Sequence, residues 1–222
     1  MFDCILLMAG SGSRAALDIN KVFYKIDNKY LFEYPLHEFL TLKECNKVIL
    51  VCRKEDLPLL EAFKSPRIIV TEGGAMRQDS VAKGMAETTA AIELIHDAAR
   101  YNIFASDILK VYAGVKEHQA AVLANKITDT IKVVNDNKAV KTLDRSKLWA
   151  MQTPQGVKRS LYLAAIASAE REGYYGTDDV ELIEKYTNIS AQIIPGRSDN
   201  YKLTNHEDIK LCELILRSRN DV

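Results

Sequence analysis

The stretch CILLMAGSGSR, residues 4–14, places a short apolar run directly before a loop of small residues that ends in an arginine. A continuous apolar run of this length is typical of a strand that is buried on both faces, as in a parallel sheet. Small residues let the loop backbone close tightly and turn its N–H groups toward a bound anion. The stretch therefore predicts an α/β fold with an anion site at the carboxyl end of its first strand.

The same order, a buried strand followed by an amphipathic helix, recurs through the first half of the chain. Repeated strand–helix units predict a three-layer α/β architecture with a mostly parallel sheet. Because no internal repeat or linker is visible, we expect one domain over residues 1–222. The expected strands are 4–8, 48–52, 68–70, 93–97 and 120–124. The expected helices are 30–42, 54–63, 79–90 and 106–118, the last with Ser106 as its N-cap.

The alternation breaks after Ile127. Residues 130–142 read TIKVVNDNKAVKT, with two β-like runs around Asn135-Asp136-Asn137, which predicts a β-hairpin. An isolated hairpin is only marginally stable in water, so we expect it to pack on something such as a second subunit; the alternative is an irregular surface excursion. Beyond it we expect helices at 157–172 and 178–186, a strand at 191–194, and a last helix from an Asn205 cap to about 219.

The composition is that of an ordinary globular protein. The 222 residues are 47% hydrophobic, and 30 basic residues balance 30 acidic ones, so the net charge gives no reason to expect nucleic acid or an anionic membrane as a partner. The four cysteines form no C-x-x-C pair, which argues against a zinc or redox motif and for core packing in a reducing compartment. With no visible signal peptide and no apolar run long enough for a membrane span, we expect a cytoplasmic location.

The loop Gly10-Ser11-Gly12-Ser13-Arg14, with Lys21 shortly after it, is the first candidate site. The P-loop string G-x-x-x-x-G-K-[ST] is absent. The dinucleotide pattern G-x-G-x-x-[GA] is met by Gly10, Gly12 and Ala15, but the second strand ends at Arg53, where an NAD site would have an acid. The remaining interpretation is a nucleotidyltransferase loop in which Lys21 reaches back to a triphosphate.

Four further stretches carry polar groups at strand ends or on loops. In HDAAR, residues 96–100, Asp97 could hold Mg²⁺ at the end of a buried strand, whereas His96 is expected to be a packed or hydrogen-bonded histidine. In GGAMRQDSV, residues 73–81, two glycines stand before a helix that begins near Arg77 and would allow a ligand close to the backbone; the alternative is a simple connection. The last two stretches, LDRSKLWAMQTPQ at 143–155 and GRSDNYK at 196–202, each supply a cation that could, taken alone, be surface charge.

Taken together and in this order, MAGSGSR, GGAMRQDSV, HDAAR, LDRSKLWAMQTPQ, GTDD and GRSDNYKLT resemble the motifs of the 2-C-methyl-D-erythritol 4-phosphate cytidylyltransferase family of the non-mevalonate isoprenoid pathway. The resemblance covers essentially the whole chain. It implies a Rossmann-like nucleotidyltransferase fold with a protruding β-hairpin arm, at about 128–148, that reaches over the partner in a homodimer. The chain departs from the family pattern at several positions, among them Asn20 and Val22, where the family has Pro and Gln around the lysine.

The resemblance also implies roles for individual residues, with Mg²⁺ or another divalent cation as cofactor. Arg14 and Lys21 match the pair that stabilises charge on the triphosphate, and Lys202 with Arg145 would position the attacking phosphate. Asp97 matches the acid near the metal. The implied nucleotide site is Met8, Ala9, Gly10, Gly74, Arg77, Ser80 and Ala98. The implied substrate contacts are Asp97, Arg100, Thr130, Arg145 and Thr153, those on the arm being supplied to the neighbouring subunit.

The implied reaction transfers a cytidylyl group from CTP to 2-C-methyl-D-erythritol 4-phosphate and releases pyrophosphate. A ribitol 5-phosphate cytidylyltransferase, which resembles this family in its nucleotide site, is the nearest alternative. An NADP-binding oxidoreductase using Gly10, Gly12, Ala15 and Arg53 is a more remote one. A catalytically silent interaction protein that has kept the fold is the last. Leu143-Asp144-Arg145 and Trp149 look more like the methylerythritol type than the ribitol type. The joint presence of Arg14, Lys21, Asp97, Arg145 and Lys202 argues against a silent protein.

Overall fold

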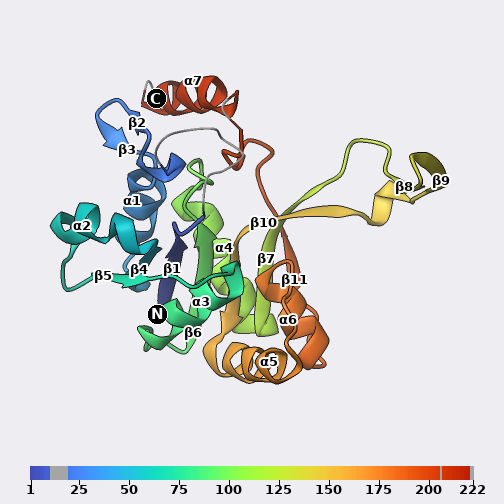
Figure 1. The fold of residues 1–222 in the computed structure, drawn as a ribbon, viewed down its shortest axis with the longest axis horizontal. Helices are drawn as coiled ribbons and strands as arrows, with labels where there is room; N and C mark the ends of the chain where they lie inside the picture. The colour runs from blue at the N-terminus through green and yellow to red at the C-terminus, as the bar shows by residue number, and fades with distance from the viewer. Residues whose placement is uncertain (11–19, 206, 221–222) are drawn as a thin grey trace.

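A central sheet of seven strands organises the molecule, which we describe from a computed structural model over residues 1–10, 20–205 and 207–220 (Figure 1). The strand order is β11-β7-β10-β6-β1-β4-β5. All neighbours are parallel except β10, which runs antiparallel to both β6 and β7. The strands are β1 Phe2–Leu7, β4 Cys45–Cys52, β5 Ile68–Glu72, β6 Ile92–Asp97, β7 Ala120–Lys126, β10 Trp149–Lys158 and β11 Gln192–Pro195.

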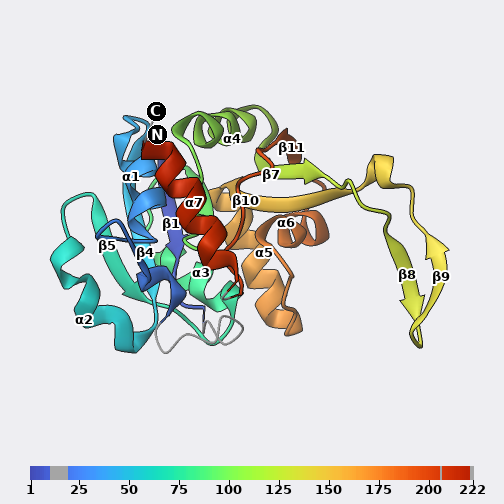
Figure 2. The same cartoon turned by 90° about the horizontal axis from the view of Figure 1, so that it is seen from above.

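A β-hairpin arm between β7 and β10 projects from the body of the molecule (Figure 2). Its strands, β8 Lys132–Asn135 and β9 Lys138–Thr142, are antiparallel, and every residue in both is exposed. Asp136 and Asn137 turn the chain with φ values of 47° and 61°, in the left-handed region that Asn and Asp tolerate in tight hairpin turns. The predicted hairpin is therefore confirmed, and it stands out from the sheet as the resemblance implied.

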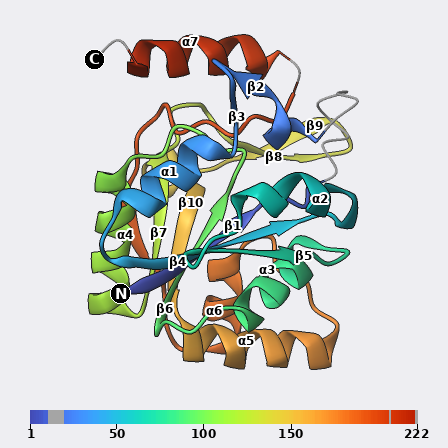
Figure 3. The same cartoon turned by 90° about the vertical axis from the view of Figure 1, so that its left-hand side faces the viewer.

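Helices cover both faces of the sheet, which confirms the three-layer architecture (Figure 3). Along β1 the side chains alternate: Cys4 and Leu6 pack into the core under α1 and α4, while Ile5 packs into the core formed with α3, α5 and α6. The chain end α7 packs in a third, smaller core with Tyr101. The helices are α1 Glu33–Thr41, α2 Leu57–Leu60, α3 Arg77–Ala86, α4 Ala105–His118, α5 Arg159–Glu172, α6 Asp179–Tyr186 and α7 Asp208–Asn220.

Several predicted element boundaries were wrong. The helix expected from Tyr30 begins at Glu33, after a short hairpin of β2 Lys25–Ile26 and β3 Lys29–Tyr30. The helix expected over 54–63 is divided into the four-residue α2 and two flanking 3₁₀ turns. The N-cap of α4 is Phe104, not Ser106. The last helix begins at Asp208, whose carboxylate accepts hydrogen bonds from the backbone N–H groups of Thr204 and Asn205.

The largest error concerns β10. Residues 157 and 158 were expected to begin a helix, but they end a ten-residue strand inserted between β6 and β7. The run QTPQG, which contains a proline and a glycine, gave no strand signal of its own. Its strand conformation is imposed by the ladders on both sides. Gly156 shows how closely β10 packs against its neighbours, since a Cβ there would lie 2.5 Å from the Val115 side chain and 2.7 Å from the Leu94 side chain.

Within the described residues, no helix is both long and apolar enough to cross a membrane. All four cysteines are buried and none is in a disulfide. The same residues contain no group of three or more His, Cys, Asp or Glu side chains arranged to hold a metal ion.

Glu93 is a buried acid near the start of β6, beside Asp3 of β1, at the end of these strands opposite to their carboxyl ends. Neither carboxylate oxygen has a hydrogen-bond partner among the described residues, and Arg159 Nε lies 3.7 Å from Oε1. Burial raises the pKa of Glu93 to about 8. The folded protein therefore holds a proton here that the unfolded chain, with a glutamate pKa near ~4.3, releases at neutral pH.

Between about pH 5 and 8, the contribution of Glu93 is expected to lower the free energy of unfolding by roughly 3–5 kcal/mol, and Glu93→Gln should remove this contribution. The sign follows because, at Glu93, the folded state binds more protons than the unfolded state over this range. His96, whose pKa is lowered on folding, acts in the opposite direction but is the same in both proteins, so the difference between them reports Glu93. Urea unfolding of both proteins at the two pH values measures the difference. Glu87→Gln, at an exposed acid after α3, is the control. Parallel pH dependences in the wild type and Glu93→Gln would contradict the assignment.

Candidate active site

A cavity of about 330 Å³ opens at the carboxyl edge of the parallel strands. Segments far apart in the sequence meet there: the end of β1, the turn that carries Lys21, the loop into α3, the end of β6, and the loop before α7. The predicted site residues that line it are Met8, Ala9, Gly10, Lys21, Gly74, Arg77, Ser80, Asp97 and Lys202. Ala98, which was also predicted to line the nucleotide site, is buried, and Ala99 lines the cavity instead.

The loop between β5 and α3 shapes one wall with its backbone. A Cβ on Gly74 would lie 2.2 Å from the Cβ of Asp79, so only glycine fits this close approach. Ser80, in the first turn of α3, accepts a hydrogen bond from the Gly74 N–H at 3.0 Å and donates to the Met76 carbonyl at 3.1 Å. Its hydroxyl therefore fixes the turn. Among residues 1–10, 20–205 and 207–220, no atom lies within 4 Å of the place where a Cβ on Gly10 would stand.

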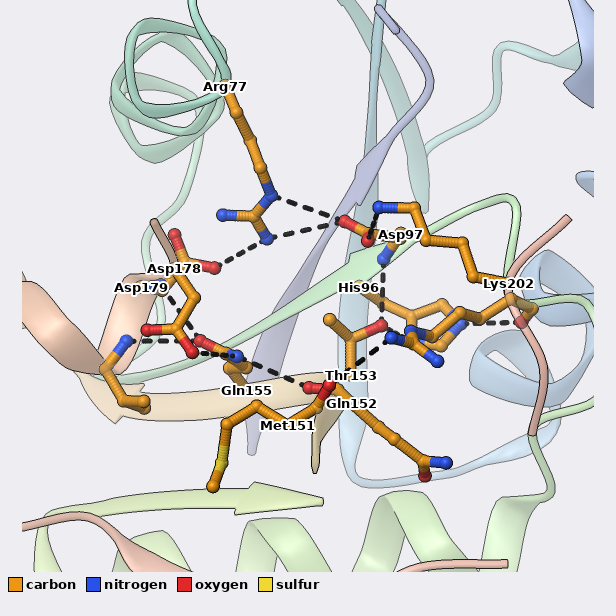
Figure 4. A network of polar contacts seen from close by, with 12 residues as sticks. Arg77, His96, Asp97, Met151, Gln152, Thr153, Gln155, Asp178, Asp179 and Lys202 are labelled. Atoms are coloured by element: carbon orange, nitrogen blue, oxygen red, sulfur yellow. Dashed lines mark hydrogen bonds and ion pairs between the residues drawn. The ribbon is translucent and has the colours of Figure 1, made fainter. Parts of the chain in front are cut away.

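Asp97 at the end of β6 is the electrostatic centre of the cavity (Figure 4). Lys202 Nζ lies 2.6 Å from its Oδ2, and the Arg77 guanidinium lies 3.4 Å from its Oδ1. Burial alone would raise the pKa of Asp97, but the charges of Arg77 and Lys202 outweigh it and hold the pKa well below its usual range. Asp97 is therefore ionised at any pH at which the protein works.

A hydrogen-bonded chain behind Asp97 fixes its backbone. Thr153 Oγ1 accepts from the Asp97 N–H at 3.1 Å and lies 2.9 Å from His96 Nδ1, while His96 Nε2 lies 3.0 Å from the Arg100 carbonyl. Burial lowers the pKa of His96 to about 4, so the ring is neutral, accepts from the Thr153 hydroxyl and donates to Arg100. His96 is the packed, hydrogen-bonded histidine that was predicted. Thr153, predicted as a substrate contact, has its hydroxyl buried against His96 and does not line the cavity.

Arg100 and Asn200 connect the loop that carries Lys202 to strand β10. Arg100 donates to the Asn200 carbonyl at 2.9 Å and, at 3.4 Å, to the carbonyl of Met151. Asn200 in turn donates to Gln152 Oε1 at 3.2 Å and to the Thr153 carbonyl at 3.1 Å. The prediction that Asn200 supports this loop is confirmed. Arg100, predicted to touch the substrate phosphate, makes these backbone contacts and does not line the cavity.

Asp179 is a site residue to which the sequence analysis assigned no role. It accepts a hydrogen bond from Arg77 at 2.7 Å (Figure 4). It accepts another from the Tyr162 hydroxyl at 2.9 Å. Gln155 holds the start of α6 in place by accepting from the backbone N–H groups of Asp179 and Val180. Arg77 is thus shared between Asp97 and Asp179. The GTDD motif could have indicated that a helix starts here with one acid, Asp179, not needed as its cap. It could not have indicated that this acid pairs with Arg77.

The remaining predicted residues lie elsewhere. Thr130 and Arg145 are exposed on the arm, where Arg145 donates to the Thr128 carbonyl at 2.7 Å, and neither lines the cavity of its own chain. Arg14 lies outside the described residues. Arg53 makes two hydrogen bonds to Asp56, at 2.7 and 2.8 Å, so the cation that an NADP site would need is already paired.

The parallel sheet, with a cavity of about 330 Å³ at its carboxyl edge lined by Lys21, Arg77, Asp97 and Lys202, fits a Rossmann-like nucleotidyltransferase. Residues 3–218 match the family model described as 2-C-methyl-D-erythritol 4-phosphate cytidylyltransferase, and the chain belongs to this family. The family suggested by the sequence motifs is therefore confirmed, and with it the enzyme class.

Relatives of that name match over nearly their whole length. The chain is 33% identical to the one from Clostridioides difficile, covering 97% of this chain and 94% of that protein. It is 35% identical to the one from Aquifex aeolicus, with both chains covered in full. Among solved structures, 4-diphosphocytidyl-2C-methyl-D-erythritol synthase from Anaerococcus prevotii superposes with a TM-score of 0.87 at 25% identity, over 97% of this chain and 98% of that one. The Thermus thermophilus cytidylyltransferase gives 0.82 at 26% identity, over 98% and 100%.

Proposed function

We propose that the chain transfers the cytidylyl group of CTP to 2-C-methyl-D-erythritol 4-phosphate, giving 4-diphosphocytidyl-2-C-methyl-D-erythritol and pyrophosphate. The observation that carries this proposal is a cavity lined by Lys21, Arg77, Asp97 and Lys202, with Arg77 and Lys202 paired to Asp97, in a member of this family. An oxygen of the substrate phosphate attacks the α-phosphorus of CTP. The new P–O bond forms as the bond to the bridging oxygen breaks, and pyrophosphate leaves.

Cytidylyl transfer depends on the alignment of the two substrates and on neutralisation of phosphate charge more than on proton transfer. A phosphate monoester is already a nucleophile near neutral pH, so no general base is required. Among the described residues, the only histidine at the site is His96, which is neutral. Both of its ring nitrogens are hydrogen-bonded, Nδ1 with the Thr153 hydroxyl and Nε2 with the Arg100 carbonyl. Lys21 would stabilise the negative charge that grows on the triphosphate, and Lys202 would guide the incoming phosphate. Main-chain groups of 8–10 and Gly74 would bind the cytidine.

We infer a divalent cation, Mg²⁺ in the simplest case, as part of the same site. Magnesium keeps several waters and typically binds through one or two carboxylates together with substrate phosphates, so a single acid in the cavity fits it. Asp97 is the residue that would hold it. When bound, the ion would neutralise phosphate charge and orient the triphosphate. Because Lys202 and Arg77 already surround the Asp97 carboxylate, we expect the metal to bind with the nucleotide rather than before it.

The arm supports a homodimer in which each subunit completes the other's site. Its valines Val133, Val134 and Val140 are exposed, which is unfavourable for a hairpin that is only marginally stable alone. Thr130 and Arg145 stand on this arm and lie outside the cavity of their own chain. We propose that they contact the substrate bound to the partner. The buried, unpaired cysteines support a reducing compartment and hence the cytoplasm.

Mixing two inactive variants tests whether Arg145 acts across the dimer. If it does, a Lys21→Ala subunit paired with an Arg145→Ala subunit contains one site with both wild-type residues. With random exchange, half of the dimers are mixed and half of their sites are intact, so activity should return to about a quarter of the wild-type value. Each variant refolded alone under the same conditions is the control. A mixture no more active than its components would show that Arg145 serves its own subunit or none.

Pyrophosphate release tests the proposed reaction directly. The protein with Mg²⁺ and methylerythritol phosphate should release pyrophosphate from CTP faster than from ATP, GTP or UTP. Replacing the acceptor with ribitol 5-phosphate separates the sister activity, which uses the same nucleotide. A folded protein that releases pyrophosphate with neither acceptor would refute the proposal, and a preference for ribitol 5-phosphate would change the substrate but not the reaction class.

A further inference from the structure

Asn20, the residue before Lys21, is buried and ties this part of the chain to two strands of the sheet. Its side-chain amide donates to the Met8 carbonyl, just after β1, at 2.8 Å and to Asp56 Oδ2, beyond β4, at 3.1 Å. Its side-chain Oδ1 accepts from the Val22 N–H at 3.4 Å and so caps the 3₁₀ turn Lys21–Phe23. All three hydrogen-bonding contacts fix the backbone on which Lys21 stands.

The Asp56 end of this contact is itself rigid. Asp56 is 4% exposed, and the Arg53 guanidinium donates two hydrogen bonds to its carboxylate, at 2.7 and 2.8 Å. Such a paired carboxylate is fixed in orientation and remains a strong acceptor. Arg53 therefore orients Asp56, Asp56 and Met8 orient Asn20, and Asn20 precedes Lys21 directly in the chain.

The residues after Lys21 are anchored as well. Val22 and Phe23 are buried in the core under α1, and the Phe23 ring packs edge-on against Tyr30 and Phe32 at 5.7 Å between ring centroids. With Asn20 held on one side and this apolar pair on the other, the Lys21 backbone has little freedom. Its side chain lines the cavity, as does Asn20 itself.

We propose that Asn20 is a positioning residue for Lys21: through Met8 and the Asp56–Arg53 pair, it sets where the ammonium group meets the triphosphate. The inference rests on the proposed role of Lys21 in cytidylyl transfer. Small misplacements of a charge in such a site cost much of its stabilisation of the transition state. The hydrogen bonds of Asn20 thus fix the position of the Lys21 backbone more closely than the packing of Val22 and Phe23 alone.

A double-mutant cycle separates positioning from folding. Asn20→Ala should lower kcat for pyrophosphate release about tenfold in the wild type, but less than about twofold in Lys21→Ala, because there is then no ammonium group to misplace. Asn46→Ala is the matched control: this asparagine also donates to a carboxylate, that of Asp3 at 2.8 Å, but does not line the cavity. It should leave kcat within about twofold of wild type.

Thermal unfolding checks that the variants are folded, which is expected for Asn20→Ala because Asp56 keeps its pairing with Arg53. If the alanine variant unfolds, Asn20→Leu retains the volume without the donors and takes its place in the cycle. An equal loss of kcat from Asn20→Ala in both backgrounds, or no loss in either, would overturn the inference. A Lys21→Ala enzyme with wild-type kcat would instead remove the role proposed for Lys21, and the inference with it.

Discussion

Replacing Lys21 with alanine is expected to lower the turnover of cytidylyl transfer by about 10²- to 10³-fold. The lysine lines the cavity at the carboxyl edge of the sheet, where the other described cations of the lining, Arg77 and Lys202, are paired with Asp97. A fixed donor aimed at charge that develops in the transition state contributes roughly 3–4 kcal/mol, which corresponds to that loss. The effect should fall mainly on kcat, because the charge grows as pyrophosphate departs and is smaller in the bound ground state.

Steady-state kinetics of pyrophosphate release, with CTP and acceptor varied separately, measure this effect. Lys25→Ala is the matched control, since Lys25 belongs to the same segment but is exposed and lies over the Tyr30 ring. The control should retain turnover within about twofold of the wild type. A Lys21→Ala enzyme whose KM for CTP rises while kcat stays unchanged would assign the lysine to nucleotide binding alone.

The sequence predicted the parallel part of the sheet well because its strands are buried on both faces. The runs around Cys4, Val48 and Ala121 are continuous and apolar, which is typical of strands in the centre of an α/β sheet. The hairpin arm was predictable for another reason. Asp136 and Asn137 are among the few residue types that tolerate a left-handed turn, so local chemistry alone marked it.

Strand β10 and the partners of the site residues were not predictable in this way. The conformation of β10 depends on ladders with β6 and β7, residues tens of positions away. The acid that holds Arg77 is likewise separated from it by 102 positions, and the donor to Thr153 Oγ1 by 56. Local patterns identify residues able to carry charge or to donate a hydrogen bond. Only the fold decides whether such a residue faces the cavity, as Lys202 does, or another side chain, as the Thr153 hydroxyl does.

Asp97→Asn is expected to reduce kcat/KM for CTP by about 10²-fold or more, and to raise the Mg²⁺ concentration needed for half-maximal rate. The amide keeps the shape of the carboxylate but not the charge that would hold the metal and that now pairs with Lys202 at 2.6 Å. Titration of rate against Mg²⁺ at saturating CTP measures the second effect. Asp199→Asn is the control, because Asp199 pairs with Arg197 on the same loop as Lys202 but does not line the cavity.

The pH dependence distinguishes this role of Asp97 from a merely structural one. Since its pKa is held well below the usual range, the carboxylate stays ionised down through pH 5, and the wild-type rate should show no step attributable to Asp97 between pH 5 and 8. The stability that the charged pair contributes is present above the unfolded pKa, about 3.9, and is lost as the pH falls below it toward the folded pKa. The difference in unfolding free energy between the wild type and Asp97→Asn should therefore be constant from about pH 5 to 8 and shrink in acid. A difference that instead disappears between pH 5 and 7 would mean that Asp97 titrates in that range, and that Arg77 and Lys202 do not hold it as a permanent anion.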